Sequence, residues 1–492
     1  MLTPFFPSWR SLLAPRKSRL RHAAQALRPA TLSQIEQQLA PALPKDLLQK
    51  PPSGDHCRQR VFDLTRTFWC WIWQIFQGNT SCREVLRQVQ ALLGLLEQPP
   101  IDEDGSAYCQ ARAKLSASLL DKALAASVAS ARAQAPAQRL LQGRPIKFAD
   151  GSSVRLEDTP ANRAEFPPPE NQHGRPAFPT LKALVLFDLA SGTVLERATG
   201  NLKVAETRLL MSLHQQIQPG DILGGDRAFG LYIIAQWAKS LGADLLARLN
   251  TRSRRVDFRK AHKKLGPHDA LFLWRKPQVR SKLFTPEQWA QVPDTLLVRL
   301  VQIRVQVPGF RTRELTVVTT LLDPELYPAK EILAAFLKRW RLEMCLDDLK
   351  TTLGMEQLKC RTPAVVQKEL AVFLLAHNLL RWIMCQAAKS GQVDLERISF
   401  KGTLDAFRQW CQALVQVRGP SKLAKQKRLW RDLLRTLAAD LVPERPGRQE
   451  PRAVKKRSKY PRLTKPRGQY VERWSRNKRR RVQRANKRAL LN

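Results

Sequence analysis

The sequence predicts an α/β fold, and three patterns along the chain support this prediction. Residues 145–250 alternate between strand-like and helix-like patterns, whereas residues 55–140 and 329–440 have helical patterns throughout. A β-rich insertion at 251–328 separates the two parts of the core. The chain ends in a basic tail at 441–492. We therefore expect an α/β core, an all-helical N-terminal domain and a basic C-terminal tail.

The order of the elements in residues 145–250 specifies the kind of core. The patterns predict strands at 147–157, 180–192, 193–202, 221–229 and 243–250, and helices at 205–217 and 231–242. Turn residues separate the elements, as at Ser191-Gly192 and Pro219-Gly220. The resulting order, β-β-β-α-β-α-β, is that of a ribonuclease H-like fold.

Residues 1–54 form a basic N-terminal segment, and the helical domain at 55–140 follows it. Ser81 and Glu84 match the capping box that begins a helix, and Ser116 begins a second helix. Two helices joined by a turn are compatible with a DNA-reading module, although such pairs are common in proteins that do not bind DNA.

Two apolar stretches are predicted to lie in the core. The aromatic run at 68–76 is more typical of core packing than of a binding surface. The stretch at 370–387 contains His377, Asn378 and Arg381, which are costly in a bilayer. We expect a buried helix there rather than a membrane span.

The charge of the chain indicates its partner. The net charge is +42 and the pI is about 10.8, a field that favours polyanions such as nucleic acid. Residues 445–492 contribute 19 Lys and Arg against 2 Glu, and a tail of this kind lies on phosphates without reading bases. An anionic membrane would instead require a basic amphipathic helix or a lipidation signal, and neither pattern is present. We expect no membrane contact.

The cysteines give no metal-binding pattern. The eight cysteines are scattered and no C-x-x-C pair occurs among them. Structural zinc is therefore not expected, and reduced thiols in a cytosol are the simplest interpretation.

One predicted helix, residues 336–350, carries a distinctive face. Phe336, Arg339, Glu343 and Lys350 fall within an arc of roughly 60° if the helix is regular. A carboxylate between two cations is suited to cutting nucleic acid, because the acid holds a metal and the cations hold phosphate. A solvated charged face with an Arg339–Glu343 pair would explain the same pattern.

Two further acids are predicted to meet Glu343. Asp150 lies on the first strand of the core and Asp226 near the end of the fourth, which pairs beside the first in this fold. Two adjacent carboxylates repel unless a cation lies between them. Three converging carboxylates suit Mg²⁺, and two such ions activate a nucleophile and stabilise a leaving oxygen. Taken singly, Asp150 is equally typical of a turn and Asp226 of a helix cap.

At these residues the chain resembles the DDE transposases of the bacterial insertion-sequence IS-four family. That family carries a Tyr-x2-Arg-x3-Glu-x6-Lys signature around its third acid, which here reads Phe336, Arg339, Glu343 and Lys350. The strings ADGSSVRLEDTPANRAEFP and GDRAFGLY around the first two acids also match. The resemblance extends from about residue 55 to residue 467.

The resemblance implies a transposase with Asp150, Asp226 and Glu343 as its catalytic and metal-binding residues. Mg²⁺ is the implied cofactor, with Mn²⁺ as a substitute. The implied reaction is cleavage at terminal inverted repeats followed by strand transfer into target DNA, within a homodimeric synaptic complex. The implied location is the bacterial cytoplasm, at the nucleoid.

Phe336 departs from the signature, because tyrosine is usual at that position. The aromatic ring is kept, but the hydroxyl group that the family is expected to use on phosphate is lost. Phe336, Arg339 and Lys350 are the implied phosphate-contacting residues. Two alternatives remain open: a catalytically inactive DNA-binding repressor derived from a transposase, and a structure-specific nuclease without strand transfer.

Overall fold

The computed structural model describes residues 32–443, apart from 59, 96–100, 102–103, 170–177, 251–255, 305–313 and 416–422. Most of the predicted N-terminal segment and the basic tail from residue 444 onward lie outside the described residues. The boundaries of the predicted domains therefore stay predictions.

The N-terminal part is helical, as predicted. Its helices are α3 (Leu32–Leu39), η1 (Ala40–Ala42), α4 (Leu64–Phe76), α5 (Cys82–Leu95), α6 (Ser106–Lys114) and α7 (Ala117–Arg132). The Ser81 hydroxyl accepts a hydrogen bond from the Glu84 amide, and Ser116 caps α7 through the Leu119 amide. The aromatic run on α4 is buried throughout, which confirms its place in the core.

Nine strands form one sheet within the described residues, in the order β3-β2-β1-β4-β5-β9-β8-β7-β6. The first five are β1 (Ile146–Arg155), β2 (Thr180–Asp188), β3 (Val194–Gly200), β4 (Ile222–Gly230) and β5 (Asp244–Leu249). β1 runs antiparallel to β2 and parallel to β4, and β4 runs parallel to β5. The helices α9 (Glu206–Ser212), followed by η3 (His214–Gln216), and α10 (Tyr232–Ser240) complete the predicted β-β-β-α-β-α-β order.

The region predicted as an insertion extends this sheet. It contains η4 (Phe258–Lys260), β6 (Lys263–Gly266), β7 (Asp269–Arg275), α11 (Pro286–Gln291), β8 (Thr295–Arg304) and β9 (Glu314–Thr319). β9 pairs antiparallel with β5, so the added strands continue the hydrogen-bonded sheet of the core. Two short elements, η2 (Leu141–Gly143) and α8 (Pro160–Glu165), flank β1.

The C-terminal part is helical from residue 329, as predicted. It consists of α12 (Ala329–Leu337), α13 (Arg339–Asp347), the π-helix η5 (Asp348–Thr352), α14 (Pro363–Gly391), η6 (Leu395–Arg397), α15 (Phe400–Val415) and α16 (Leu423–Ala439). The expectation of one regular helix over 336–350 is wrong. The helix is interrupted at Lys338, and its last turn widens into η5, which rotates Lys350 away from the regular arc.

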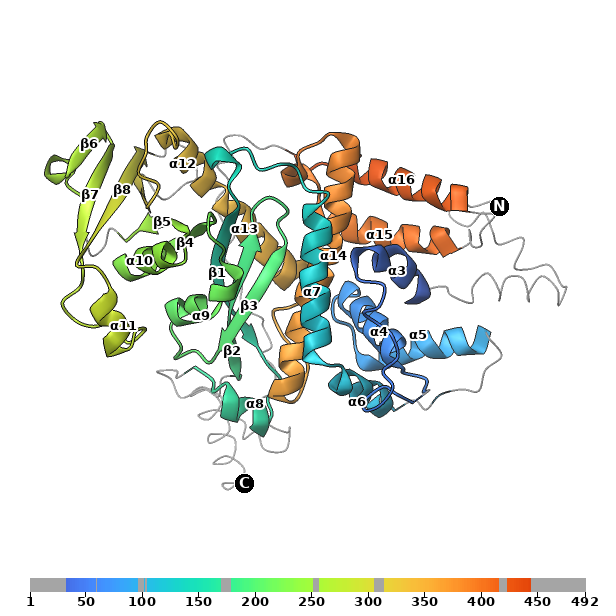
Figure 1. The fold of residues 1–492 in the computed structure, drawn as a ribbon. Helices are drawn as coiled ribbons and strands as arrows, with labels where there is room; N and C mark the ends of the chain where they lie inside the picture. The colour runs from blue at the N-terminus through green and yellow to red at the C-terminus, as the bar shows by residue number, and fades with distance from the viewer. Residues whose placement is uncertain are drawn as a thin grey trace, which may run out of the picture. The chain divides into compact units, whose positions relative to one another are not determined.

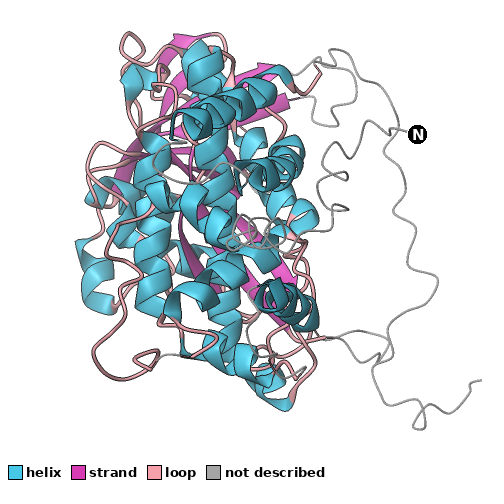
Figure 2. Cartoon of the chain, turned by 90° about the vertical axis from the view of Figure 1, so that its right-hand side faces the viewer, coloured by secondary structure: helices cyan, strands magenta, loops and turns pink. Residues whose placement is uncertain are grey.

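Helices cover both faces of the core sheet (Figures 1 and 2). On one face, α7 packs against β3, α12 against β5, and α13 against β1; on the other, α9 and α10 pack against the strands from β2 to β5. Among the described residues, only α14 is long and apolar enough to cross a membrane, and 94% of its apolar window is buried inside the protein. That burial is typical of the core helix of a soluble protein.

Candidate active site

Asp150 lies on β1, on the face of the sheet that α13 covers. Its carboxylate is half-buried and accepts a hydrogen bond from the amide of Gly151 at 3.0 Å. Burial raises the pKa of Asp150 to about 6, Arg339 opposes this shift, and the charges of Glu343 and Asp226 reinforce it. The pKa of one residue thus reflects the proximity of the other two predicted acids.

Asp226 lies on the neighbouring strand β4. The parallel register pairs Phe148 with Gly224, and Asp150 and Asp226 each follow this pair by two residues on their strands. The Asp226 carboxylate accepts a hydrogen bond from the Ala228 amide at 2.7 Å, where the pairing of β4 with β5 becomes irregular. A strand irregularity of this kind changes the direction in which side chains point, and such irregularities are frequent beside active sites.

The two glycines before Asp226 do not leave space for a ligand. A Cβ atom on Gly224 would lie 2.3 Å from the ring of Phe148, and one on Gly225 would lie 2.5 Å from the ring of Phe229. They admit aromatic rings of the core instead.

Glu343 reaches the site from α13 but is paired with Arg339. Arg339 Nη2 lies 2.6 Å from Glu343 Oε1, and the two side chains are 23% and 34% exposed. The Arg339 guanidinium also lies 5.9 Å from the ring centroid of Phe336, which is buried. Phe336 therefore contacts Arg339 rather than the surface, and it supports the guanidinium from below.

The charges of the three acids influence one another, but the three carboxylates do not form a metal-binding cluster. Among the described residues, no three acidic, histidine or cysteine side chains lie closely enough to hold a metal ion. The Glu343 carboxylate is instead paired with Arg339. The structure therefore contains the Arg339–Glu343 pair that an ordinary charged helix face would have. The charge of Glu343 also contributes to the raised pKa of Asp150.

Sequence analysis missed a cation at this site, Arg248 on β5. Burial lowers the pKa of Arg248, and the positive charges of Arg227 and Arg339 lower it further, whereas Asp226 opposes the shift. Arg248 is therefore near both the second acid and the signature arginine. The signal was available, because Arg248 is the one charged residue in the interior of the apolar string DLLARL.

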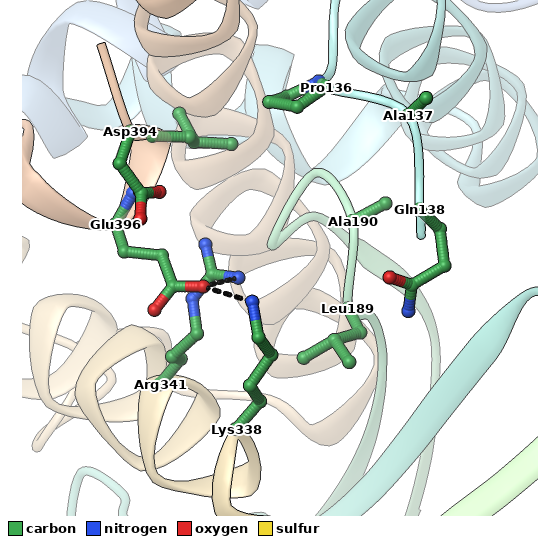
Figure 3. Close-up of a pocket in the computed structure, with 10 residues that line it drawn as sticks. Pro136, Ala137, Gln138, Leu189, Ala190, Lys338, Arg341, Asp394 and Glu396 are labelled. Carbon is green, nitrogen blue, oxygen red and sulfur yellow. Dashed lines mark hydrogen bonds and ion pairs between the residues drawn. The ribbon is translucent and has the colours of Figure 1, made fainter. Parts of the chain in front are cut away.

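Two other cations of the interrupted helix are neutralised elsewhere. Lys338 and Arg341 line a small pocket between the α12–α13 junction and η6, where both bind Glu396 Oε1, at 2.7 and 2.5 Å (Figure 3). Lys350 lies on η5, and its ammonium has no ion-pair partner in the part of the chain that the structure describes. Arg339 is paired with Glu343, so Lys350 is the cation of residues 336–350 for which no ion pair occurs among the described residues.

Two other acids of the core, Asp221 and Asp158, have structural roles. The Asp221 carboxylate forms a buried ion pair with Lys147 and accepts a hydrogen bond from the Gln218 amide. The Asp158 carboxylate accepts hydrogen bonds from both the Nε and the Nη2 of Arg163. Each carboxylate is neutralised by its own cation, unlike that of Asp150.

Comparison with known proteins shows which proteins this chain is similar to. The family described as Transposase DDE domain matches residues 141–379, a range that contains all three acids. The transposase InsG for insertion sequence element IS4 of Escherichia coli (strain K12) is 24% identical over 412 residues, covering 82% of this chain and 88% of that protein. A solved structure, the piggyBac transposase synaptic complex with hairpin DNA, aligns over 86% of this chain and 85% of that chain with a TM-score of 0.38 and 8% identity.

The match to the Transposase DDE domain over residues 141–379 supports transposase activity with DDE-type chemistry for this protein. Within that class, the chain is similar to the IS4 family of insertion-sequence transposases, the family that its signature resembles.

Proposed function

We propose that the chain cleaves DNA at the terminal inverted repeats of a mobile element and joins the ends to target DNA. The proposed core is ribonuclease H-like, supported by the element order and by the strand order β3-β2-β1-β4-β5. The observation that carries the proposal is the position of Asp150 on β1 under α13, where burial raises its pKa and the charges of Glu343 and Asp226, from two other elements, raise it further. Asp221 and Asp244 at the same sheet are paired with cations instead.

The donor set fits a hard divalent cation. DDE transposases generally use such metals, and Asp150, Asp226 and Glu343 offer carboxylate oxygens, the ligands that Mg²⁺ prefers. We propose Mg²⁺, in a two-metal site, with Mn²⁺ as a substitute. When bound, the metal supplies activation of a water or 3′ hydroxyl and stabilisation of the leaving oxygen.

The Arg339–Glu343 pair indicates how DNA completes the site. A phosphate competes with Glu343 for the Arg339 guanidinium, since both are anions that arginine binds bidentately. Transfer of Arg339 to phosphate releases Glu343 toward Asp150 and Asp226. Lys350 adds a second phosphate contact, and Phe336 positions Arg339 from beneath. We propose Arg248 as a further phosphate contact beside Asp226.

The remaining parts of the chain are proposed to hold the DNA. The helical domain recognises the inverted repeats, and the basic tail adds contacts to phosphate that carry no sequence choice. Cleavage at two ends and joining to one target take place in a homodimeric synaptic complex. The proposed location is the bacterial cytoplasm, at the nucleoid.

The decisive experiment compares two Asp→Asn variants of the purified chain on inverted-repeat DNA with Mg²⁺. Asp226→Asn is expected to bind DNA normally and to lose cleavage by at least about a hundredfold, because a metal ligand is removed. Asp158→Asn is the matched control, since Asp158 is neutralised by Arg163, and it is expected to cleave normally. Unchanged cleavage by Asp226→Asn would contradict the acid assignment.

The same preparation separates the two alternative functions. Pre-cut ends are incubated with a target plasmid, and joined products are counted. A protein that nicks the DNA but never joins it is a nuclease without strand transfer. A protein that binds the repeats and does not cut is a repressor, and Phe336 is the departure from the signature that favours this outcome.

A further inference from the structure

Three side chains of the helical domain converge at a place that the acidic face does not use. Cys82 is the first residue of α5, and Cys109 and Arg112 lie one turn apart on α6. The two sulfur atoms are 3.7 Å apart although the residues are 27 positions apart in sequence. Arg112 Nη2 lies 3.2 Å from the Cys82 sulfur and 3.7 Å from the Cys109 sulfur.

Arg112 is a buried cation that requires an anion. It is 7% exposed, and no carboxylate pairs with it among the described residues. Its other neighbours are the Gln74 side-chain oxygen at 3.3 Å and the rings of Trp71 and Tyr108, with centroids about 5 Å away, while its Nε has no partner. A buried charge is costly unless it is compensated. The ionisable groups near it are Tyr108, Cys360, Cys82 and Cys109, and burial raises the pKa of Tyr108 and Cys360. The Cys82–Cys109 pair, which contacts Arg112 through sulfur, is therefore the source of a compensating anion.

The two thiols differ in ways that suit different chemical steps. Cys109 is exposed, whereas Cys82 is half-buried. The hydrogen bond from Cys82, together with the charge of Arg112, lowers the pKa of Cys109 to about 6 against the opposing effects of burial and Asp104. The hydrogen bond to Cys109 and burial raise the pKa of Cys82. Cys109 is therefore the accessible nucleophile, and Cys82 is a protonated thiol held beside it.

We propose that Cys82, Cys109 and Arg112 form a thiol site that reacts with small hydroperoxides. The Cys109 thiolate attacks one oxygen of the hydroperoxide, the O–O bond breaks, and the departing alkoxide or hydroxide takes a proton from solvent. Cys109 is now a sulfenic acid. The Cys82 sulfur attacks the Cys109 sulfur, and the Cys82 proton leaves with the hydroxyl group as water. Two thiols are oxidised to one disulfide, and one peroxide is reduced.

The product has a defined structural effect. The disulfide links the first residue of α5 to α6. Both helices belong to the helical domain that is proposed to recognise the inverted repeats. It also removes the anion that compensates Arg112. Reduction by a dithiol restores the starting site through ordinary thiol–disulfide exchange. This site does not depend on the acidic face, so its chemistry is testable whether or not the protein cleaves DNA.

The first experiment measures thiol reactivity in the full-length chain with iodoacetamide, followed by peptide mass spectrometry. At pH 6 Cys109 is expected to react about tenfold faster than Cys57, because its larger thiolate fraction outweighs its lower intrinsic nucleophilicity. Cys57 is a suitable reference, being partly exposed. The Cys109 rate should have its pH midpoint near 6. Equal rates at Cys57 and Cys109, or a midpoint above 8, would overturn the proposal.

The second experiment adds one equivalent of hydrogen peroxide to the same protein. A Cys82–Cys109 disulfide is expected in the parent chain and in Cys57→Ser, and none in Cys109→Ser. Cys82→Ser should accumulate a Cys109 sulfenic acid that dimedone traps. Circular dichroism establishes that each variant is folded. Oxidation spread across the other cysteines, or no dimedone adduct in folded Cys82→Ser, would contradict the assignment of the two roles.

Discussion

Two pairs of charged residues lie on or next to the neighbouring strands β1 and β4, and they differ in whether their charges balance. Near the start of the strands, Lys147 and Asp221 form an ion pair at 2.5 Å and both are buried. Three residues further along β1, the pKa of Asp150 is raised by burial and by the like charges of Glu343 and Asp226. The first pair is complete without any partner from outside the protein. The second is stable only if a cation or a proton is added.

This difference separates stability from function on one sheet. The Lys147 ammonium also donates to the Gln216 carbonyl at 2.7 Å, so its charge is fully satisfied. The Asp150 carboxylate has one backbone donor and two acidic neighbours, and its pKa is raised. Natural proteins tolerate such a local cost where function requires it. Substitutions of these charged residues and their neighbours should separate the two roles, with effects on stability that range from large to small.

The largest effect is expected at the neutral pair. Asp221→Asn leaves the Lys147 charge buried without its anion, which should lower the free energy of unfolding by about 3–5 kcal/mol. Equilibrium unfolding in urea measures the change. Asp158→Asn removes a more exposed carboxylate and should cost less than about 1 kcal/mol. A loss of less than about 1 kcal/mol in Asp221→Asn would show that the buried pair does not stabilise the sheet.

The opposite sign is expected at the acidic pair. A raised pKa means that the folded protein prefers protonated Asp150; the stability this contributes is complete below pH 3.8 and is lost as the pH rises through about 6. Asp150→Asn is neutral at every pH. Without metal, it should therefore be more stable than the parent chain at pH 8, by up to about 3 kcal/mol.

The pH dependence provides the control for Asp150→Asn. The advantage over the parent chain should disappear near pH 3, which lies below the pKa of Asp150 in the folded chain, about 6, and in the unfolded chain, 3.8. Urea unfolding at the two pH values in EDTA measures it, and the variant should be unable to cleave DNA. A variant less stable than the parent at pH 8 would indicate that Asp150 has an ordinary structural role.

The parts of the fold that depend on local sequence patterns were predictable, and the parts that depend on contacts between distant residues were not. Strand and helix periods are local, so the order of the core elements from β1 to β5 was predicted correctly. The pairing of β9 with β5 joins residues about 70 positions apart and has no local pattern. The interruption at Lys338 has no Pro or Gly to signal it, so it is set by tertiary packing.

The site was predictable to a similar degree. The signature spacing and the predicted strand order were sufficient to expect Asp150, Asp226 and Glu343 on one face of the core. Arg248 was not identified, because one arginine in an apolar strand is interpretable only when its neighbours across the sheet are known. The Cys82–Cys109 contact was missed for the same reason, since the spacing of these residues matches no local thiol motif.

The next comparison concerns two arginines on opposite sides of α13. Arg341→Gln removes one of the two cations that bind Glu396, where the side chains are 18% and 28% exposed, and should cost about 1–2 kcal/mol of stability while leaving DNA cleavage intact. Arg339→Gln breaks a partly exposed pair and should cost less than about 1 kcal/mol while abolishing most cleavage. Urea unfolding and a nicking assay on each variant measure both quantities. Equal loss of cleavage in the two variants would indicate a shared structural effect.

The smallest effect on stability is expected at Phe336, where the chain departs from its family signature. The ring is 4% exposed and lies against Arg339, so Phe336→Tyr should change stability by less than about 1 kcal/mol if its hydroxyl reaches toward the guanidinium side. A hydroxyl there adds a donor for the phosphate that Arg339 is proposed to hold, and cleavage should rise several-fold. Phe336→Leu serves as the control, because it removes the ring under Arg339 and should reduce cleavage. If tyrosine lowers cleavage as leucine does, the ring acts on Arg339 by packing alone, and the loss of the hydroxyl has been accommodated in this chain.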